Sequence, residues 1–501
     1  MKNKYISLIG LLTLFIVIIL INFCLFPISV LAKGEHNQNK NKEVVEKIQE
    51  ANNQLKNDIK YEKYCRIACA AFPFYRATNY LFWDDFSKDN RFSKFSSEQT
   101  NIWISGDLHV DNFGAYHNDE NEVIFDLNDF DESVISNYQY DVWRMATSII
   151  LSISNSHTTT LNLDEKNQIA DVIDKFTESY LDTLAEYQGN NDETKTYFTN
   201  KNTEGEIKEL IEYAEKKSRN KLLEKWTIDE KDRKRFKTPK ERDILGIASL
   251  EEKEAITSQM KAYGNTLTGK LEYNENYFKV KDIAPRLKAG LGSLGTPRYY
   301  ILLEGESDSL EDDRILDIKR QSKPTPYHVF NSTEKATYDK FFDNDAQRHA
   351  IAYRALTKHT DDFLGWMYLS DKNGEFSGYY SVREMSPNKA SLDDLEDKEG
   401  NAFTFANAKQ SDLLEIAKLW GKILATDHAR ADKDFEEKYI PYSFEKEVTQ
   451  LTNGKHKEFR ELVKEVAFDY ANQVESDYDS FLQFITKLKL EKQLINCPNC
   501  D

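Results

Sequence analysis

The chain has 501 residues, 30% of them charged and 40% hydrophobic, which is typical of a globular protein with a large core and two or three domain-sized units. The formal net charge is -18. This acidity argues against a nucleic-acid partner, because phosphate backbones are bound by clustered Lys and Arg side chains.

The N-terminal segment over residues 1–32 resembles a secretory signal. Lys2 and Lys4 precede an apolar run that ends in Val30-Leu31-Ala32, which resembles a small-residue cleavage site. The run is long for a signal peptide, so an uncleaved membrane anchor is the alternative. We therefore expect a secreted or membrane-anchored protein whose body is extracytoplasmic.

The next two regions differ in composition. Residues 33–60 are rich in Lys, Asn and Glu, which predicts a polar tether that runs into a surface helix. Residues 61–265 predict a helical lobe, with helical spacing from about 161 onward and short strand-like runs within 101–155. The candidate catalytic and metal-binding loops fall between these short runs.

The last two regions predict a sheet followed by helices. In residues 266–390, strand-and-turn signals predict a small β-sheet lobe with one helix over 333–360 and a closing hairpin made of GWMYLS and GYYSVREM. Residues 391–501 predict C-terminal helices of the larger lobe, over 408–430 and 443–492. The elements together predict an α+β fold.

Four cysteines follow the N-terminal segment. Cys65 and Cys69 form a CxxxC pair, and Cys497 and Cys500 form a CxxC pair. Outside the cell, such pairs form one or two disulfides. The alternative is a zinc site with four thiolate ligands.

Two acidic clusters form the first candidate site. GDLHVDN contains Asp107 and Asn112, and FDLNDFDE contains Asp126, Asp129 and Asp131 beside a predicted strand. Carboxylate and amide oxygens suit Mg²⁺, and a further aspartate can orient an attacking hydroxyl. The alternative is a set of Asx turns with solvated acids. Flanking apolar residues favour a site, because they place the acids against a core, where an unpaired charge is costly.

A glycine-rich turn forms the second candidate site. AGLGSLGTPRYYILLEG contains Gly290, Gly292, Ser293 and Gly295, and a predicted strand follows it instead of the helix of a dinucleotide-binding fold. A glycine-rich turn between strands covers nucleotide phosphates in kinase-like folds, with a lysine on the next strand. Lys319 ends that next strand. The alternative is an ordinary hairpin with a solvated lysine.

The segment LWGKILATDHARAD is a third candidate. It predicts a helix that ends in His428, Arg430 and Asp432. These side chains could contact a phosphate, but capping of the helix C-terminus by the basic residues is the favoured interpretation.

Taken together, these motifs resemble the protein-kinase-like superfamily, most closely the aminoglycoside and choline phosphotransferases, whose loops are HGDxHxxN and IDFxxA. Ser105 replaces the leading histidine, and Gly106-Asp107-Leu108-His109 and Asn112 match the first loop. Asp129-Phe130 matches the second loop, and Asp141 follows twelve residues after Asp129, as in that branch.

The motif order differs from that of ordinary kinases, because the glycine-rich turn and Lys319 follow the catalytic loop. This order resembles a circular permutation, and it is that of the bacterial family called domain of unknown function 2252. Similar signatures cover about 62–440: AFPFYRATNYLFWDDF, GDLHVDNFG, NDFDES, YDVWRMATSI, GLGSLGTPRYYILLEG, DIKRQ, YYSVREMSPNKASLD and DHARAD.

The resemblance implies a circularly permuted kinase-like fold and an ATP- and Mg²⁺-dependent phosphotransferase, acting on a hydroxyl of an unknown small molecule or protein. Asp107 would be the catalytic base or hydroxyl-orienting residue. Asn112 and Asp129 would bind Mg²⁺, with Asp131 as a helper and Asp126 as a rival ligand. The phosphates would be bound by a larger set: Gly290, Gly292, Ser293, Gly295 and Lys319.

One expected partner is missing from the sequence. The glutamate that normally pairs with the kinase lysine is not evident in 333–360, where Glu334 lies near the start and Gln347 and Arg348 lie nearer the middle. A catalytically silent ligand-binding protein is therefore a second hypothesis. A metal-dependent phosphoesterase is a third, since GDLH resembles the GDxH motif, but the 9 histidines supply no Asn-His or Gly-His-x-His motif.

Overall fold

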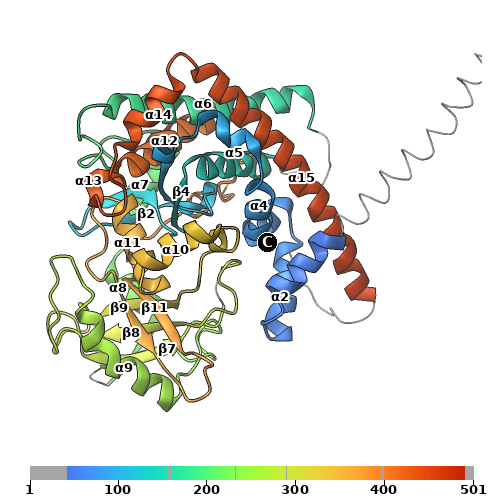
Figure 1. Cartoon of the computed structure of the whole chain (residues 1–501). Helices are drawn as coiled ribbons and strands as arrows, with labels where there is room; N and C mark the ends of the chain where they lie inside the picture. The colour runs from blue at the N-terminus through green and yellow to red at the C-terminus, as the bar shows by residue number, and fades with distance from the viewer. Residues whose placement is uncertain (1–41, 155–160, 232, 289, 397–399, 491–501) are drawn as a thin grey trace, which may run out of the picture. The chain divides into compact units, whose positions relative to one another are not determined.

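The computed structural model describes residues 42–154, 161–231, 233–288, 290–396 and 400–490 (Figure 1). As expected, the fold is mixed α+β, with many helices and small antiparallel sheets. No helix in these ranges is both long and apolar enough to cross a membrane. The expected signal segment and the CxxC pair lie outside the described residues.

The chain divides into two compact units, and the smaller combines residues up to Ala68 with residues from Glu475 onward. It contains α2 (Asn57–Ile67) and the end of α15 (His456–Leu490), where the Tyr64 ring packs edge-on against Phe481 and Phe484. Cys65 in this unit and Cys69 in the larger one are both disulfide-bonded. The disulfide alternative therefore holds for these two residues, since zinc requires free thiolates.

The larger unit, Cys69–Val474, contains the remaining elements and both candidate loops. Its helices, besides the start of α15, are α3 (Ala71–Ala77), α4 (Asn79–Phe86), α5 (Gln139–Ile153), α6 (Leu163–Tyr187), α7 (Gly205–Glu215), α8 (Arg219–Trp226), α9 (Leu250–Gly264), α10 (Ser332–Phe341), α11 (Asp345–Leu356), α12 (Gln410–Arg430), α13 (Lys433–Glu436) and α14 (Phe444–Thr452).

Strand pairing brings the two candidate loops together. Residues 105–112 connect β1 (Asn101–Ile104) to β2 (Phe113–His117), and residues 128–133 connect β3 (Val123–Leu127) to β4 (Val134–Asn137). β1 pairs with β4, and β2 pairs with β3, both antiparallel. Ile104 lies opposite Val134 and Phe113 lies opposite Leu127, so both loops leave the same ends of the two strand pairs. The loops must therefore lie side by side.

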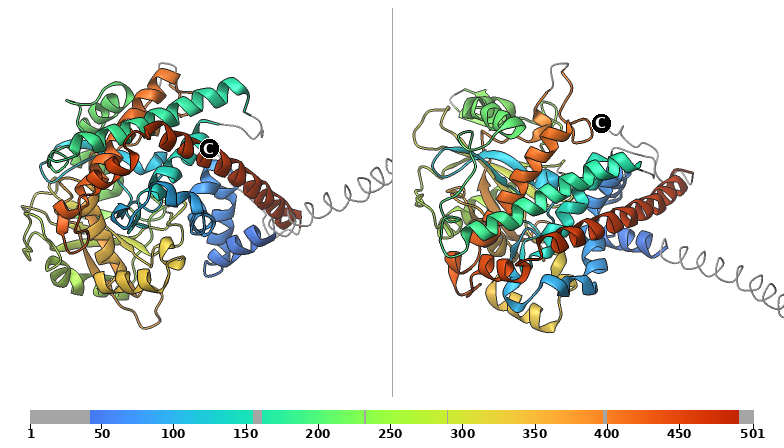
Figure 2. Two further views of the ribbon diagram at one scale, coloured as in Figure 1. Left: turned by 45° about the horizontal axis from the view of Figure 1, so that its top comes forward. Right: turned by 90° about the horizontal axis from the view of Figure 1, so that it is seen from above.

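A helical layer supports these strands. α5 is buried around most of its circumference, as expected for a central helix. α12 packs closely against α6, and Figure 2 shows the two helices beside one another. Their close approach depends on Gly421, because a Cβ atom there would lie 2.3 Å from the carbonyl oxygen of Phe176.

The five-stranded antiparallel sheet has the order β10-β11-β9-β8-β7. One face of this sheet packs against α9 through an apolar cluster that includes Ile256, Ile301 and Ile318. The opposite face has a smaller apolar cluster with Trp226 of α8 and Ile315, so polar side chains occupy the rest of it. The strands are β7 (Val280–Pro285), β8 (Arg298–Leu303), β9 (Arg314–Arg320), β10 (Gly365–Leu369) and β11 (Gly378–Glu384).

Three expectations about local structure need correction. The single helix expected over 333–360 is two helices, α10 and α11, because Phe342 is extended and the Asn344 side chain caps α11 at the Gln347 amide. The helical region before residue 265 is interrupted by a hairpin of β5 (Thr227–Glu230) and β6 (Arg233–Phe236). The helix expected over 443–492 is divided into α14 and α15 near Gly454, which has a φ of 70°.

The substitution Gly421→Val tests the packing of α6 against α12. The added side chain would overlap the backbone of α6, so we expect the free energy of unfolding to fall by about 1–3 kcal/mol, as for overpacked cores. Chemical denaturation measures this change, with Lys418→Ala on the exposed side of α12 as the control. Equal stability of Gly421→Val and wild type would contradict the close helix approach.

Candidate functional site

One face of α5 holds the first candidate loop. Asp141, Arg144 and Ser148 follow the i, i+3, i+7 spacing of a single helix face. The Asp141 carboxylate accepts hydrogen bonds from the backbone amides of Ser105 (2.6 Å) and Gly106 (3.0 Å). The Ser148 hydroxyl oxygen accepts a hydrogen bond from the Val110 amide at 3.2 Å. The loop backbone is thus fixed at both ends by one helix.

The Asp107 side chain is held by the third residue of that face. Arg144 donates from Nε to Asp107 Oδ1 at 2.7 Å and also from Nη2. Arg144 is fully buried, with its guanidinium carbon 4.2 Å from the centre of the Tyr75 ring. Burial raises the pKa of Asp107 to about 7, against the opposing effect of Arg144, and Glu132 and Asp129 raise it further. Asp107 is therefore placed to exchange a proton near neutral pH.

The two candidate loops touch through their backbones. Gly106 has a φ of 76°, and a Cβ atom there would lie 2.2 Å from the carbonyl oxygen of Glu132. The Asn128 amide donates to the carbonyl oxygen of Asn112 at 2.9 Å. The Asn112 side-chain amide group donates to the Asp107 carbonyl oxygen at 3.4 Å, which leaves its amide oxygen as the atom it could offer to a cation.

The second loop contacts the sheet through Asp131. Lys319 Nζ of β9 forms an ion pair with Asp131 Oδ2, and Gln321 donates to Asp131 Oδ1 at 2.8 Å. Burial alone would raise the pKa of Asp131, but Lys319 holds it well below its usual range. Lys319 and the acidic loop, 188 residues apart in the chain, are thus brought together.

Asp129 has a different environment from Asp131. Its side chain is accessible, and no cation forms an ion pair with it among the described residues. Its packed surroundings and the charge of Asp131 raise the pKa of Asp129. A carboxylate and an amide oxygen are ligand types that suit Mg²⁺, and Asp129 and Asn112 offer them from two loops whose backbones are in contact.

Helix α11 fixes the backbone of the second loop. Arg348 is fully buried and donates to the carbonyl oxygens of Phe130 (3.2 Å), Ser133 (2.7 Å) and Asp131 (2.7 Å). Glu334 does not pair with Lys319, because it accepts a hydrogen bond from the Asn331 amide in the capping box of α10. Among the described residues, no glutamate forms an ion pair with Lys319, and Asp131 pairs with the lysine.

Asp126 lies in the core. It is 2% exposed, and its carboxylate accepts a hydrogen bond from the Leu127 amide at 2.8 Å. Burial raises its pKa to about 6, and the buried carboxyl group of Asp427 is hydrogen-bonded to it. Asp126 is therefore buried, whereas Asp129 is exposed.

The third candidate segment makes contacts within the fold. His428 Nδ1 lies 2.8 Å from the Tyr180 hydroxyl, and Arg430 donates to the carbonyl oxygens of Leu356 and Thr196. The Asp432 carboxylate accepts hydrogen bonds from the amides of Asp434 and Phe444. These contacts give the segment a structural role, but His428 and Arg430 bind other segments and not the C-terminal carbonyl groups of their own helix.

The contacts of His109 also indicate a structural role. It is 5% exposed, and Arg76 Nε donates to His109 Nε2 at 3.3 Å. Burial, together with the charges of Arg76 and Arg144, lowers the pKa of His109 well below its usual value. A neutral imidazole that accepts a hydrogen bond from Arg76 stabilises the loop.

The glycine-rich turn connects β7 to β8, and Arg298 at the start of β8 lies opposite Lys319 in the sheet. The turn is closed by a 3.1 Å hydrogen bond from the Ser293 amide to the Gly290 carbonyl oxygen, and Gly295 has a φ of 88°. A Cβ atom at Gly290 or Gly292 would meet no protein atom within 4 Å. Packing within the protein therefore does not require glycine at these two positions.

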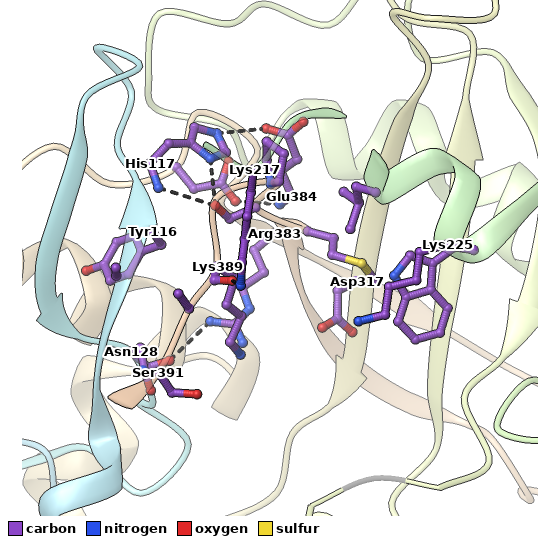
Figure 3. Close-up of a pocket in the computed structure, with 18 of the residues that line it drawn as sticks. Tyr116, His117, Asn128, Lys217, Lys225, Asp317, Arg383, Glu384, Lys389 and Ser391 are labelled. Atoms are coloured by element: carbon purple, nitrogen blue, oxygen red, sulfur yellow. Dashed lines mark hydrogen bonds and ion pairs between the residues drawn. The ribbon is translucent and has the colours of Figure 1, made fainter. Parts of the chain in front are cut away.

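A cavity of about 610 Å³ adjoins the second loop (Figure 3). It is enclosed by the β2–β3 hairpin, α8, the polar face of the sheet and the segment 385–394. Asn128, which precedes Asp129, and Gly290 of the glycine-rich turn both line it. The cavity therefore borders the candidate site at Asn128 and Gly290.

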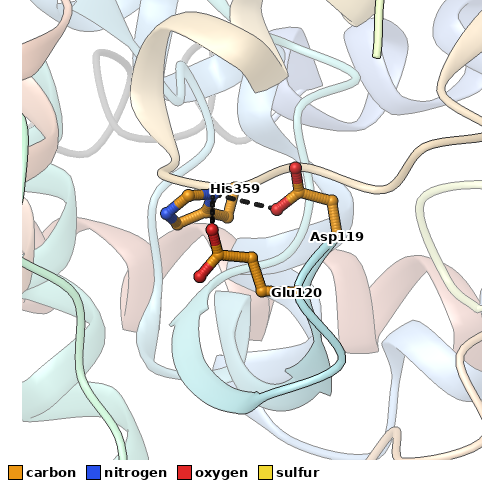
Figure 4. A group of neighbouring side chains, drawn as sticks. All are labelled: Asp119, Glu120 and His359. Carbon is orange, nitrogen blue, oxygen red and sulfur yellow. Dashed lines mark ion pairs between the residues drawn. The ribbon is translucent and has the colours of Figure 1, made fainter. Parts of the chain in front are cut away.

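A separate group, Asp119, Glu120 and His359, has the ligand types of a metal site (Figure 4). His359 Nδ1 lies 2.9 Å from Asp119 Oδ1 and 3.6 Å from Glu120 Oε1. Lys270 Nζ lies 3.5 Å from the other Asp119 oxygen. The group is accounted for by these ion pairs and shares no residue with the predicted metal ligands.

Several basic residues of the site were not predicted from the sequence. Arg144 could have been found, because it lies three residues after Asp141 and so shares its helix face. Arg348 and Arg383 had no such signal. Arg383 of β11 donates to the carbonyl oxygen of Asn128 at 3.2 Å, a contact between segments more than 250 residues apart.

The raised pKa of Asp107 predicts a pH-dependent stability. The folded pKa of about 7 lies above the unfolded value of about 3.9, so the native state holds an extra proton between them. Wild type should therefore lose stability relative to Asp107→Asn as the pH rises from about 4 to about 7. Thermal denaturation across this range measures the difference, with Asp171→Asn on the exposed side of α6 as the baseline. Parallel curves for wild type and Asp107→Asn would contradict the prediction.

Comparison with known proteins identifies the family to which the chain belongs. Residues 57–484 match the family described as an uncharacterized protein conserved in bacteria (DUF2252). No curated protein and no solved structure matches the chain. Because the matched region spans well over half of the 501 residues, the chain belongs to the DUF2252 family.

Proposed function

We propose that this protein is an ATP- and Mg²⁺-dependent phosphotransferase that transfers a phosphoryl group to a hydroxyl acceptor. The observation that carries the proposal is the ion pair between Lys319 of the sheet and Asp131 of the acidic loop. A lysine that binds nucleotide phosphates must lie beside the carboxylates that bind the metal, and this contact fulfils that requirement.

The order of elements in the sheet supports a kinase-like interpretation. A glycine-rich turn connects the first two strands, β7 and β8, and the lysine lies on the third strand, β9. Two helices, α10 and α11, follow β9 before the sheet is completed by β10 and β11. Kinases combine a glycine-rich loop, a lysine on the third strand and a following helix in the same way. Here these parts follow the catalytic loop, as in a circular permutation.

The roles of the site residues follow from their environments. Asn112 and Asp129 would hold Mg²⁺, which when bound neutralises charge on the phosphates. Asp131 would position Lys319 until nucleotide phosphates replace it as the lysine's partner. The backbone amides of the turn from Gly290 to Gly295, with Ser293, would contact phosphate oxygens.

Asp107 is the proposed base. The acceptor oxygen attacks the γ-phosphorus of ATP, the bond from that phosphorus to the bridging oxygen breaks, and ADP leaves with the electron pair. The hydroxyl proton passes to the Asp107 carboxylate, whose pKa of about 7 lies near the operating pH. Arg144 fixes the orientation of this carboxylate through its two hydrogen bonds.

A catalytically silent nucleotide-binding protein is the second candidate function. It is favoured by the same ion pairs, because Arg144 already occupies Asp107, the proposed base, and Lys319, the proposed phosphate ligand, is already paired with Asp131. A phosphoesterase finds no such support, since His109 is buried and accepts a hydrogen bond from Arg76.

Nucleotide binding can be tested by thermal denaturation with ATP and Mg²⁺. A ligand that binds only the native state raises the melting temperature by mass action, by an amount equivalent to about 2.7 kcal/mol at 100 times Kd. We expect this rise for wild type and for Asp107→Asn, and we expect its loss in Asp129→Ala and Lys319→Met. Asp107→Asn should abolish transfer to the acceptor while it retains binding. An equal rise in all four proteins would contradict the proposed site.

The glycine-rich turn gives a second test. Gly290→Val and Gly292→Val each add a side chain into open space, so the melting temperature without ligand should stay within about 2 °C of wild type. Both variants should bind ATP–Mg²⁺ at least about tenfold more weakly, because the added side chain keeps the backbone from the phosphates. Ala51→Val, at an exposed position outside the turn, is the control. Unchanged ATP affinity in both valine variants would show that the turn does not contact the nucleotide.

A further inference from the structure

The cavity beside the candidate site has an unusual balance of charge for this protein. The chain as a whole is strongly acidic, with a net charge of -18, yet basic side chains from four separate segments converge on this one cavity. Its volume of about 610 Å³ lies within the range that holds a small organic ligand.

The acidic residues that line the cavity already form ion pairs or hydrogen bonds within the protein. Arg298 donates to both oxygens of Asp317, and Lys217 lies 3.2 Å from Asp394. Glu384 is surrounded by three basic groups, from His117, Arg219 and Arg314. Asp361 accepts hydrogen bonds from the backbone amides of Phe363 and Glu384. These carboxylates therefore have little capacity left to neutralise the other cations.

Five basic residues of the lining form no ion pair with a carboxylate within the described part of the chain: Lys221, Lys225, Arg286, Arg383 and Lys389. The printed contacts of Arg286 and Arg383 are to carbonyl oxygens, of Ile244 and Asn128, and Lys225 lies over the Trp226 ring. Figure 3 shows Arg383 and Lys389 between the hairpin with Tyr116 and Asn128 and the sheet with Asp317. The five unpaired cations thus line one cavity, and Lys221, Lys225 and Lys389 are also solvent-exposed.

The ionisation of Lys389 reflects this crowding. Its packed surroundings lower its pKa to about 8, and the positive charges of Arg383 and Arg298 lower it further, against Asp317 and Asp129. A group of cations that suppress one another's ionisation is stabilised by a negative partner. A neutral base or sugar ring would leave these charges uncompensated.

We propose that this cavity binds a small anion with two or more negative charges, carried by phosphate or carboxylate groups. The forked guanidinium of Arg383 and the Lys221 and Lys389 ammonium groups bind such oxygens through charge-assisted hydrogen bonds. If the proposed function holds, this anion is the acceptor substrate, because Asn128 lines the cavity and is followed by Asp129. That last step alone rests on the proposed function.

Isothermal titration calorimetry without Mg²⁺ tests the proposal. The probes are inorganic tripolyphosphate for a phosphate ligand, citrate for a carboxylate ligand, and ATP for a nucleotide. Wild type should bind tripolyphosphate or citrate, and the affinity should fall as NaCl is raised. The stronger of the two identifies the source of the charge. An ATP affinity that falls in the Lys221→Met/Lys389→Met double variant as far as the tripolyphosphate affinity would assign the cavity to the nucleotide and overturn the acceptor assignment.

The variants separate this site from the nucleotide site. Lys221→Met with Lys389→Met should weaken binding of the anion at least about tenfold, as expected for lost charge-assisted contacts. The exposed Lys446→Met control should bind like wild type, and Asp129→Ala should bind the anion at least as tightly, since it removes a negative charge. Absence of tripolyphosphate and citrate binding in wild type, or equal binding by the double variant, would overturn the inference.

The two proposals fail in different ways. If ATP–Mg²⁺ does not stabilise wild type but the double variant loses anion binding, the cavity assignment stands and the phosphotransferase proposal fails. If ATP–Mg²⁺ binding depends on Asp129 and Lys319 while anions do not bind, the cavity assignment is the one that is wrong.

Discussion

The contact of the two loops at Gly106 and Glu132 is the constraint on which the site depends. β1 pairs with β4 and β2 with β3, so the loops leave neighbouring strand ends and meet where only a glycine fits. Asp141 of α5 and Arg348 of α11 then fix the two loop backbones by hydrogen bonds. The charge of Asp129 raises the pKa of Asp107 because this framework holds the two side chains near one another.

Charge distribution explains why the acids of these loops can be placed against a core. Burial raises the pKa of Asp107, whereas Lys319 keeps Asp131 ionised, so neighbouring carboxylates have different protonation behaviour. Such divergence among adjacent acids is typical of sites that combine proton transfer with cation binding. In the basic cavity beside them, neighbouring positive charges lower the pKa of Lys389.

Much of this arrangement could be predicted from the sequence where the signals are local. Short strand-like runs, many helical segments and the glycine-rich turn followed by a strand are all encoded by short-range patterns, and the hairpin ending in Glu384 is confirmed, whereas the pairing of β1 with β4 was not predicted. The break between α10 and α11 was missed because the Asn344 cap is a single-residue signal within a helical pattern. The partner of Lys319 and the convergence of Arg383 and Lys389 on one cavity could not be predicted, since each joins distant segments.

A crystal structure with Mg²⁺ and a non-hydrolysable ATP analogue tests the central claim most directly. The account predicts that the metal is bound by Asn112 and Asp129, and that the Lys319 ammonium leaves Asp131 for phosphate oxygens beneath the turn containing Gly290 and Gly292. An analogue bound elsewhere, or one bound at these loops with Lys319 still paired to Asp131 and far from the phosphates, would contradict it.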